Sequence, residues 1–143
     1  MPNRRRRTDS LLGVRPYVAR VPSARSILLV DDDEAIRDSL SEFLREEGFS
    51  VATAENGRDA MQWLRDHRPT PCVVLLDLMM PVMDGGEFLR AKRNDPGLSP
   101  IPVVIVTAAG APFRIDLSPD VKDLIQKPIA LPRLMAALEA CAA

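Results

Sequence analysis

A short apolar run that ends in a carboxylate is the feature that most restricts how this chain can fold. Val73 to Leu76 are four apolar residues, two of them β-branched, and Asp77 follows directly. Pro81 and the turn residues Asp84-Gly85-Gly86 then interrupt the chain. A continuous apolar run bounded by turn residues is typical of a strand buried on both faces. We therefore expect Asp77 at the carboxyl end of a central strand, where open α/β sheets build their sites.

The rest of the chain alternates between strand-like and helix-like patterns. Further strands are predicted at residues 27–30, 49–54, 101–106 and 121–126. Helices are predicted at residues 34–47, 57–67, 87–94 and 131–142. Between Pro112 and Pro119 the pattern is poor and allows at most two helical turns. This order predicts an α/β fold with a doubly wound, five-stranded parallel sheet, helices on both faces and a degenerate fourth helix.

The charge distribution divides the chain into one domain and a basic extension. Residues 1–26 carry seven arginines against one acid, Asp9, whereas the remainder has 12 basic and 19 acidic side chains. We expect residues 1–25 to be a disordered extension and residues 26–143 to form the domain. The arginines would suit nucleic acid, acidic lipid or an acidic protein. A solvated tail is the favoured interpretation, because no folded element is predicted to hold them in one geometry.

The composition also bears on the compartment. No run approaches the roughly 18 apolar residues that a membrane span needs, and no apolar stretch of a secretory signal follows the arginines. Cys72, Cys141 and the lone His67 do not have zinc-binding spacing. We expect a cytoplasmic protein with no membrane span, whose cysteines are small apolar fillers.

Polar side chains follow four of the predicted strands. Asp31 and Asp32 follow the first, Asp77 ends the third, Thr107 follows the fourth and Lys127 follows the fifth. Right-handed crossovers place these strand ends at one edge of the sheet. Neighbouring carboxylates raise one another's pKa unless a cation joins them, and hard oxygen ligands suit Mg²⁺. A hydroxyl and an ammonium suit the oxygens of a phosphoryl group. The edge is therefore predicted to hold one divalent cation and one small anion.

Taken together, these motifs closely resemble the receiver domain of bacterial two-component response regulators, the CheY-like family. The resemblance covers about residues 26–142 and implies a flavodoxin-like (βα)5 fold with a cis Lys127-Pro128 bond. It is carried by Leu29-Val30-Asp31-Asp32-Asp33, Leu76-Asp77-Leu78-Met79-Met80-Pro81 with Asp84-Gly85, Val106-Thr107-Ala108 and Lys127-Pro128.

The resemblance implies a phosphoacceptor and a metal site. Asp77 would accept a phosphoryl group from a phosphohistidine of a sensor histidine kinase or of a histidine phosphotransfer protein. Asp32, Asp77 and the backbone carbonyl of Met79 would bind Mg²⁺, and Asp31 would help directly or through water. The chain would then be a phosphoprotein of a phosphorelay, active only in its own phosphorylation and dephosphorylation and not as an enzyme on a separate substrate.

The resemblance also implies roles for the residues around the phosphoacceptor. Lys127 would pair with Asp77 and then with the phosphoryl group. Thr107 would donate its hydroxyl to a phosphoryl oxygen, and the small Ala108 would leave room for the transfer. Thr107, Ala108 and Leu124 would form the switch that reports phosphorylation.

Two departures from the family pattern lead to further expectations. Leu124 stands where the family often has an aromatic residue that rotates inward, so we expect the output to run through another change near residues 108–124. Met79 and Ala109 lie two places after Asp77 and Thr107. Both are apolar and cannot orient an attacking water, which predicts a long-lived phosphoryl group.

Three classes of function are open at this point. The first is a stand-alone receiver that binds an unknown downstream protein or relays phosphate, because no output domain is predicted after the last helix. The alternative is a pseudo-receiver, a protein-binding module that is not phosphorylated. The third class is a Mg²⁺-dependent phosphatase or nuclease. It would need a second general acid near Asp77, commonly two residues further on, and Met79 occupies that position. A nucleic-acid partner is not expected, and a homodimer is left open.

Overall fold

A computed structural model describes residues 25–67, 71, 73–108 and 119–142. Within this part of the chain, strands and helices follow one another in the order β2 (Ser26–Val30), α1 (Glu34–Glu46), β3 (Ser50–Ala54), α2 (Gly57–Asp66), β4 (Val73–Asp77), α3 (Gly85–Arg93), β5 (Val103–Ala108), β6 (Val121–Lys127) and α4 (Leu131–Ala142). The predicted degenerate fourth helix and the basic extension fall on residues 109–118 and 1–24, outside the described residues. The boundary between residues 25 and 26 stays a prediction. None of the described helices has the length and apolar character needed to cross a membrane.

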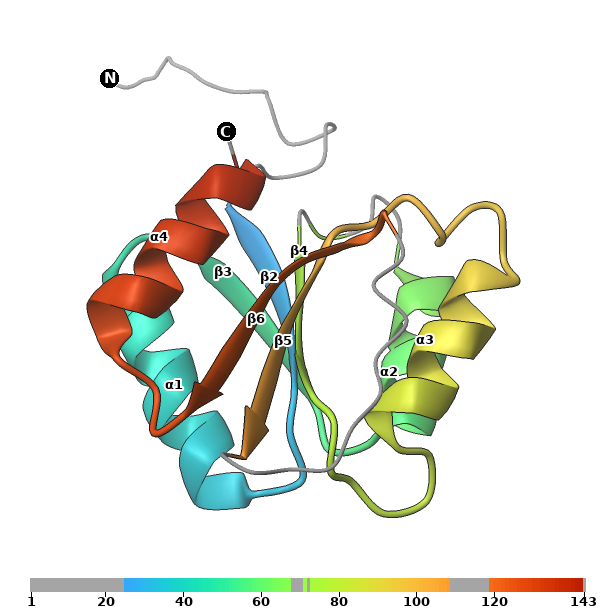
Figure 1. Cartoon of the computed structure of the whole chain (residues 1–143), viewed down its shortest axis with the longest axis horizontal. Helices are drawn as coiled ribbons and strands as arrows, with labels where there is room; N and C mark the ends of the chain where they lie inside the picture. The colour runs from blue at the N-terminus through green and yellow to red at the C-terminus, as the bar shows by residue number, and fades with distance from the viewer. Residues whose placement is uncertain (1–24, 68–70, 72, 109–118, 143) are drawn as a thin grey trace, which may run out of the picture.

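The five strands form one parallel sheet in the order β3-β2-β4-β5-β6. Strand β4 therefore lies at the centre, between β2 and β5. Because all strands run the same way, their carboxyl ends share one edge, which is the lower edge in Figure 1. The predicted doubly wound, five-stranded parallel sheet is confirmed.

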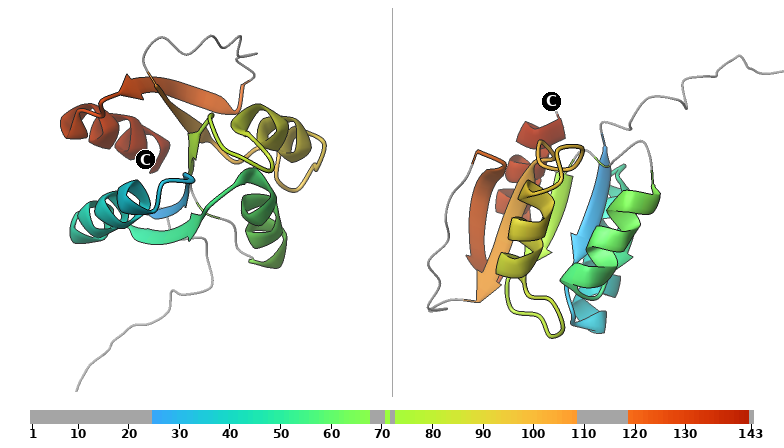
Figure 2. Two further views of the ribbon diagram at one scale, coloured as in Figure 1. Left: turned by 90° about the horizontal axis from the view of Figure 1, so that it is seen from below. Right: turned by 90° about the vertical axis from the view of Figure 1, so that its right-hand side faces the viewer.

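Helices cover both faces of this sheet, which explains the continuous apolar run of β4. Val74 and Leu76 enter a cluster that includes the buried side chains of α2 and α3. Val73 and Leu75 point the other way, into a cluster with α1 and α4. Figure 2 shows the two helix pairs on opposite sides of the sheet. Every residue of β4 is buried, which explains why Val73 to Leu76 are all apolar and makes the buried carboxylate of Asp77 an exception.

Local capping sets where the helices begin and end. The side chain of Asp33 caps α1 by accepting from the backbone N–H of Ile36 at 3.2 Å. At the other end of α1, Gly48 follows the C-cap residue Glu47 and has a φ of 100°, a left-handed conformation that suits glycine. Helix α3 begins at Gly85 and not at the predicted Glu87. The reason is a capping box, in which Asp84 accepts from the Glu87 N–H and its own N–H donates to the Glu87 side chain.

A buried ion pair joins α3 to the start of β6, and the sequence alone did not indicate it. Lys92 has no exposed surface, and its Nζ lies 2.9 Å from both Asp120 Oδ2 and the backbone oxygen of Ser99. Arg93 Nε lies 3.3 Å from Asp120 Oδ1. Burial lowers the pKa of Lys92, against the effect of Asp120. Burial alone would raise the pKa of Asp120, but Lys92 and Arg93 together hold it below its usual value.

Candidate functional site

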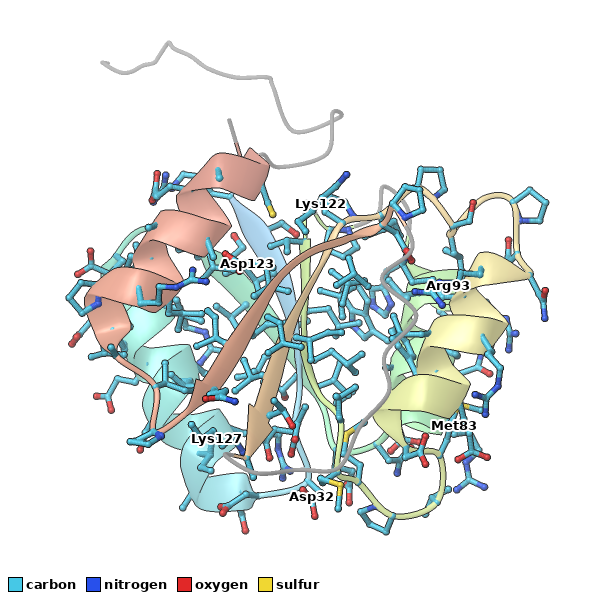
Figure 3. All side chains as sticks on the ribbon, viewed as in Figure 1. Asp32, Met83, Arg93, Lys122, Asp123 and Lys127 are labelled. Carbon is cyan, nitrogen blue, oxygen red and sulfur yellow. The ribbon has the colours of Figure 1, made fainter. Side chains whose placement is uncertain are left out.

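Three carboxylates converge at the carboxyl edge of the sheet, as the sequence predicts. Asp31 and Asp32 follow β2 and Asp77 ends β4, and one oxygen of each lies within 4.8 Å of the others. Asp31 and Asp77 are buried, whereas Asp32 is exposed. Figure 3 shows Asp32 and Lys127 at the same lower end of the sheet. This geometry gathers three oxygen donors of the kind that Mg²⁺ prefers.

The environment of Asp77 disfavours its charged form. Burial is the main cause of a raised pKa, and the charges of Asp31 and Asp32 add to it. The N–H of Met79 donates to Asp77 Oδ1 at 3.1 Å, and this hydrogen bond and the charge of Lys127 work in the opposite direction. The pKa of Asp77 still lies above its usual value of 3.8. A further cation beside the three carboxylates would therefore favour the ionised form.

Lys127 links two of these carboxylates from the end of β6. Its Nζ lies 3.5 Å from Asp31 Oδ2 and 3.7 Å from Asp77 Oδ2. The ammonium group is thus shared between the strands β2 and β4, although β6 is at the far side of the sheet from β2. The Lys127-Pro128 bond is cis, as expected.

Thr107 brings a hydroxyl to the same edge. Strand β5 ends at Ala108 and not at the predicted residue 106, so Thr107 is its next-to-last residue. It follows Val106, which pairs with Asp77 in the register of β4 and β5. Thr107 is buried, and its Oγ1 has no hydrogen-bond partner within the described residues. A buried hydroxyl without a partner is uncommon and costs stability. It is suited to donate to an anion placed beside Asp77.

The loop after Asp77 is held close to the start of α3. A Cβ added to Gly85 would lie 2.7 Å from the Cα of Leu78 and 3.0 Å from the backbone oxygen of Asp77, so only glycine fits. The N–H of Gly85 also donates to the Leu78 oxygen at 3.0 Å. This contact fixes the backbone on the amino side of Met79, whose own side chain is 55% exposed.

The same loop contains one strained residue, Val82. Its φ is 71°, its side chain is 64% exposed, and the Met83 N–H bonds to the Pro81 oxygen across it at 2.8 Å. A positive φ closed by such a hydrogen bond is a strained γ-turn for a β-branched residue, whereas asparagine is found at positive φ several-fold more often. We expect Val82→Asn to raise the free energy of unfolding by about 1 kcal/mol, measured by chemical denaturation. Val82→Ile keeps the branched side chain and should give no increase; equal stability of the two variants would contradict the explanation.

Arg37 is a residue of this region that sequence reasoning missed. It lies in the first turn of α1, and its Nη1 donates to the backbone oxygen of Asp31 at 2.7 Å. The only feature of the sequence that could have indicated this contact is the position of the arginine, six residues after Asp31 and just beyond the helix cap. Arginine on an amphipathic helix is usually solvated, so the pattern did not distinguish this contact.

The remaining predicted switch residues lie on β5 and β6, and Ala108 pairs with Lys127 in the register of these strands. Ala108 is exposed at the end of β5, and Leu124 is half-buried on β6, packed against the cluster that contains α2 and α3. The metal-binding role of the Met79 carbonyl stays a prediction. Ala109 and Cys72 lie outside the described residues, and Cys141 is a half-buried free thiol.

Comparisons with known proteins agree on one family. The family model described as the response regulator receiver domain matches residues 27–139. The response regulator MprA of Mycolicibacterium vanbaalenii is 37% identical over 116 residues, which are 80% of this chain and 48% of MprA. The response regulator Rre1 of Synechocystis sp. is 42% identical over 86 residues, which are 59% of this chain and 36% of Rre1. The chain thus spans about half the length, or less, of these curated relatives.

Solved structures share the fold. A CheY-like response regulator receiver domain protein from Methanospirillum hungatei JF-1 is 33% identical, with a TM-score of 0.69, and the match covers 82% of this chain and 90% of that one. The signal receiver domain of a signal transduction histidine kinase from Syntrophus aciditrophicus is 28% identical, with a TM-score of 0.70, and covers 82% and 89%.

Proposed function

Since this chain belongs to the response regulator receiver domain family, we propose that it acts in two-component signalling by accepting a phosphoryl group on Asp77. One observation carries the proposal. Asp77 is buried at the end of the central strand, with the carboxylates of Asp31 and Asp32 and the ammonium of Lys127 around it. Asp31 is buried beside the same groups, but it follows β2 and its Oδ1 already accepts from the Asp33 N–H, whereas Asp77 ends the central strand.

The proposed transfer forms one bond and breaks one bond. A carboxylate oxygen of Asp77 attacks phosphorus as the P–N bond to a phosphohistidine imidazole breaks, and the imidazole nitrogen keeps the electron pair. Lys127 lies 3.7 Å from Asp77 Oδ2, close enough to offset negative charge as the phosphoryl group arrives. Thr107 Oγ1, which has no partner within the described residues, supplies a hydrogen-bond donor for a phosphoryl oxygen.

The donor set fits Mg²⁺. Asp31, Asp32 and Asp77 offer three carboxylate oxygens in one cluster, and an exposed Asp32 leaves the site open to water. In this proposal they hold the ion together with the Met79 carbonyl. Bound Mg²⁺ would supply positive charge to oxygens on the transferring phosphoryl group.

The proposed output depends on the strand end that carries Thr107. An added phosphoryl group at Asp77 would attract the Thr107 hydroxyl, which has no competing partner within the described residues. This movement would shift the position of Ala108, the next residue of β5, and of the segment that leads to Leu124. Leu124 itself is held by packing against the α2 and α3 cluster, and this favours an output that does not require it to rotate.

The proposed partners are a sensor histidine kinase or a histidine phosphotransfer protein, and a downstream protein that binds the phosphorylated form. Nucleic acid is not proposed as a partner. The stand-alone action of the receiver, a cytoplasmic location, a homodimer and the long phosphoryl lifetime stay predictions.

The proposal predicts a mass gain of one phosphate on incubation with Mg²⁺ and a small phosphodonor such as acetyl phosphate. The gain should disappear when Mg²⁺ is chelated and in the Asp77→Asn variant, because asparagine of the same shape cannot attack phosphorus. Intact-protein mass spectrometry provides the measurement.

Asp123→Asn is the matched control, since Asp123 lies at the other end of β6 and pairs with Arg133 at 2.7 Å. It should keep the full mass gain. A wild-type protein that binds Mg²⁺ but gains no phosphate would favour the pseudo-receiver alternative, and continuous turnover of a phosphate ester would favour a phosphatase.

A further inference from the structure

We infer that Arg37 is a positioning residue for the metal-binding side of the site, acting on the main chain of Asp31. The inference rests on the proposed function, because it assigns Arg37 to the Mg²⁺ site that the proposal requires. Arg37 touches none of the proposed reacting groups by a side chain. Its one hydrogen bond to this region ends on a backbone oxygen, 2.7 Å from Nη1.

Asp31 is held on both sides of its backbone. Its N–H donates to the Ala54 oxygen of β3 at 3.1 Å, and its carbonyl accepts from Arg37. The Asp31 side chain is also engaged, because Oδ1 accepts from the Asp33 N–H at 2.9 Å and Oδ2 faces Lys127 at 3.5 Å. Arg37 is the side chain that fixes the carbonyl at which the chain leaves β2 and turns into α1.

This carbonyl belongs to the peptide group that leads into Asp32. The Asp32 side chain is exposed and makes no hydrogen bond or ion pair with any described residue. Its direction is therefore set by the backbone on either side of it. A charged donor on the preceding carbonyl restrains that peptide group more strongly than a neutral one.

Such a restraint is useful because the carboxylates repel one another. The oxygens of Asp31, Asp32 and Asp77 lie within 4.8 Å, and without a bound cation the exposed Asp32 is the one most able to move away. By holding the turn, Arg37 keeps Asp32 beside the two buried carboxylates. The expected consequence is tighter metal binding, as groups that orient metal ligands usually provide.

Helix α1 supplies a matched control for this role. Arg45 lies two turns further along the same helix and also donates to a backbone oxygen, that of Val51, at 3.0 Å. Val51 is in β3, away from the carboxylates. Arg37→Met and Arg45→Met therefore remove the same kind of contact, and only the first touches the residues of the site.

The test is the affinity of the full-length protein for Mg²⁺, measured by calorimetry without any phosphodonor. Arg37→Met is expected to weaken binding about tenfold, Arg45→Met less than about twofold, and Arg37→Lys, which keeps a charged donor, to recover part of the loss. With a phosphodonor, the rate at which Arg37→Met gains phosphate should be below the wild-type rate at low Mg²⁺ and approach it at saturating Mg²⁺. Hydrogen exchange at the Asp32 and Asp33 amides should become faster in Arg37→Met alone.

Several results would overturn the inference. These are an unchanged Mg²⁺ affinity in folded Arg37→Met, an equal loss in Arg45→Met, or a wild-type protein that does not bind Mg²⁺. If Arg37→Met does not fold, an affinity of Arg37→Lys equal to that of the wild type together with unchanged amide exchange would also overturn it. Failure of the proposed function is seen separately: Mg²⁺ affinity would follow Arg37 as expected, yet no variant would gain phosphate.

Discussion

Replacing Lys127 with methionine is expected to slow phosphoryl incorporation at Asp77 by at least about 100-fold. Methionine has a similar length but carries neither the charge nor the donors. The variant would lose the ammonium that lies 3.7 Å from Asp77 Oδ2 and 3.5 Å from Asp31 Oδ2. Within the described residues no other lysine or arginine forms an ion pair with these carboxylates. The rate is measured from a time course of intact mass with Mg²⁺ and a small phosphodonor.

Lys122→Met is the matched control for this experiment. Lys122 is on the same strand but is exposed near the opposite end of β6. Its replacement should leave the rate within about twofold, since surface substitutions away from a site have small effects. A Lys127→Met rate close to that of Lys122→Met would show that the shared ammonium is not needed for the transfer.

The largest expected effect on stability comes from replacing Lys92 with methionine, which should lower the free energy of unfolding by about 3–5 kcal/mol. Methionine keeps a buried side chain of similar length but lacks the ammonium that donates to Asp120 and to the Ser99 oxygen, both at 2.9 Å. Asp120 would keep its contact with Arg93 at 3.3 Å, so a loss near the lower end of that range is expected. Chemical denaturation measures the change, with Arg90→Met on the exposed face of α3 as the control.

This effect should depend on pH in one direction. The folded protein holds the pKa of Asp120 below its usual value of 3.8, so the stability that this ionised group contributes is present above that value. It is lost as the pH falls through the lower pKa of the folded state. The difference between wild type and Lys92→Met should therefore shrink under strongly acidic conditions.

The double variant Lys92→Met, Asp120→Asn completes the test. Asparagine removes the buried negative charge that Lys92→Met leaves with Arg93 alone, so this variant should recover part of the stability lost in Lys92→Met. Equal stability of the single and double variants would mean that the loss came from packing and not from the buried charge.

Much of the fold was predictable because its causes are local or follow from topology. Val73 to Leu76 form a continuous apolar run because helices cover both faces of β4. The carboxyl ends of parallel strands must share an edge, so Asp77, Thr107 and Lys127 could be placed together from their positions alone. The start of α3 was off by two residues, because the capping box of Asp84 and Glu87 decides it and both residues read equally well as turn or helix.

Periodicity and strand order are enough to identify the polar side chains at the strand ends, and hence the chemical character of the site. How those groups are held depends on contacts between elements that are far apart in the chain. Asp120 lies 28 residues from Lys92, and no local pattern indicates that the lysine is buried. The same holds for three further features: the Thr107 hydroxyl, which has no partner within the described residues, the hydrogen bond of Arg37 and the positive φ of Val82. Asp77 was therefore predictable as an acid at the edge, whereas its raised pKa was not, because burial and neighbouring charges exist only in the folded chain.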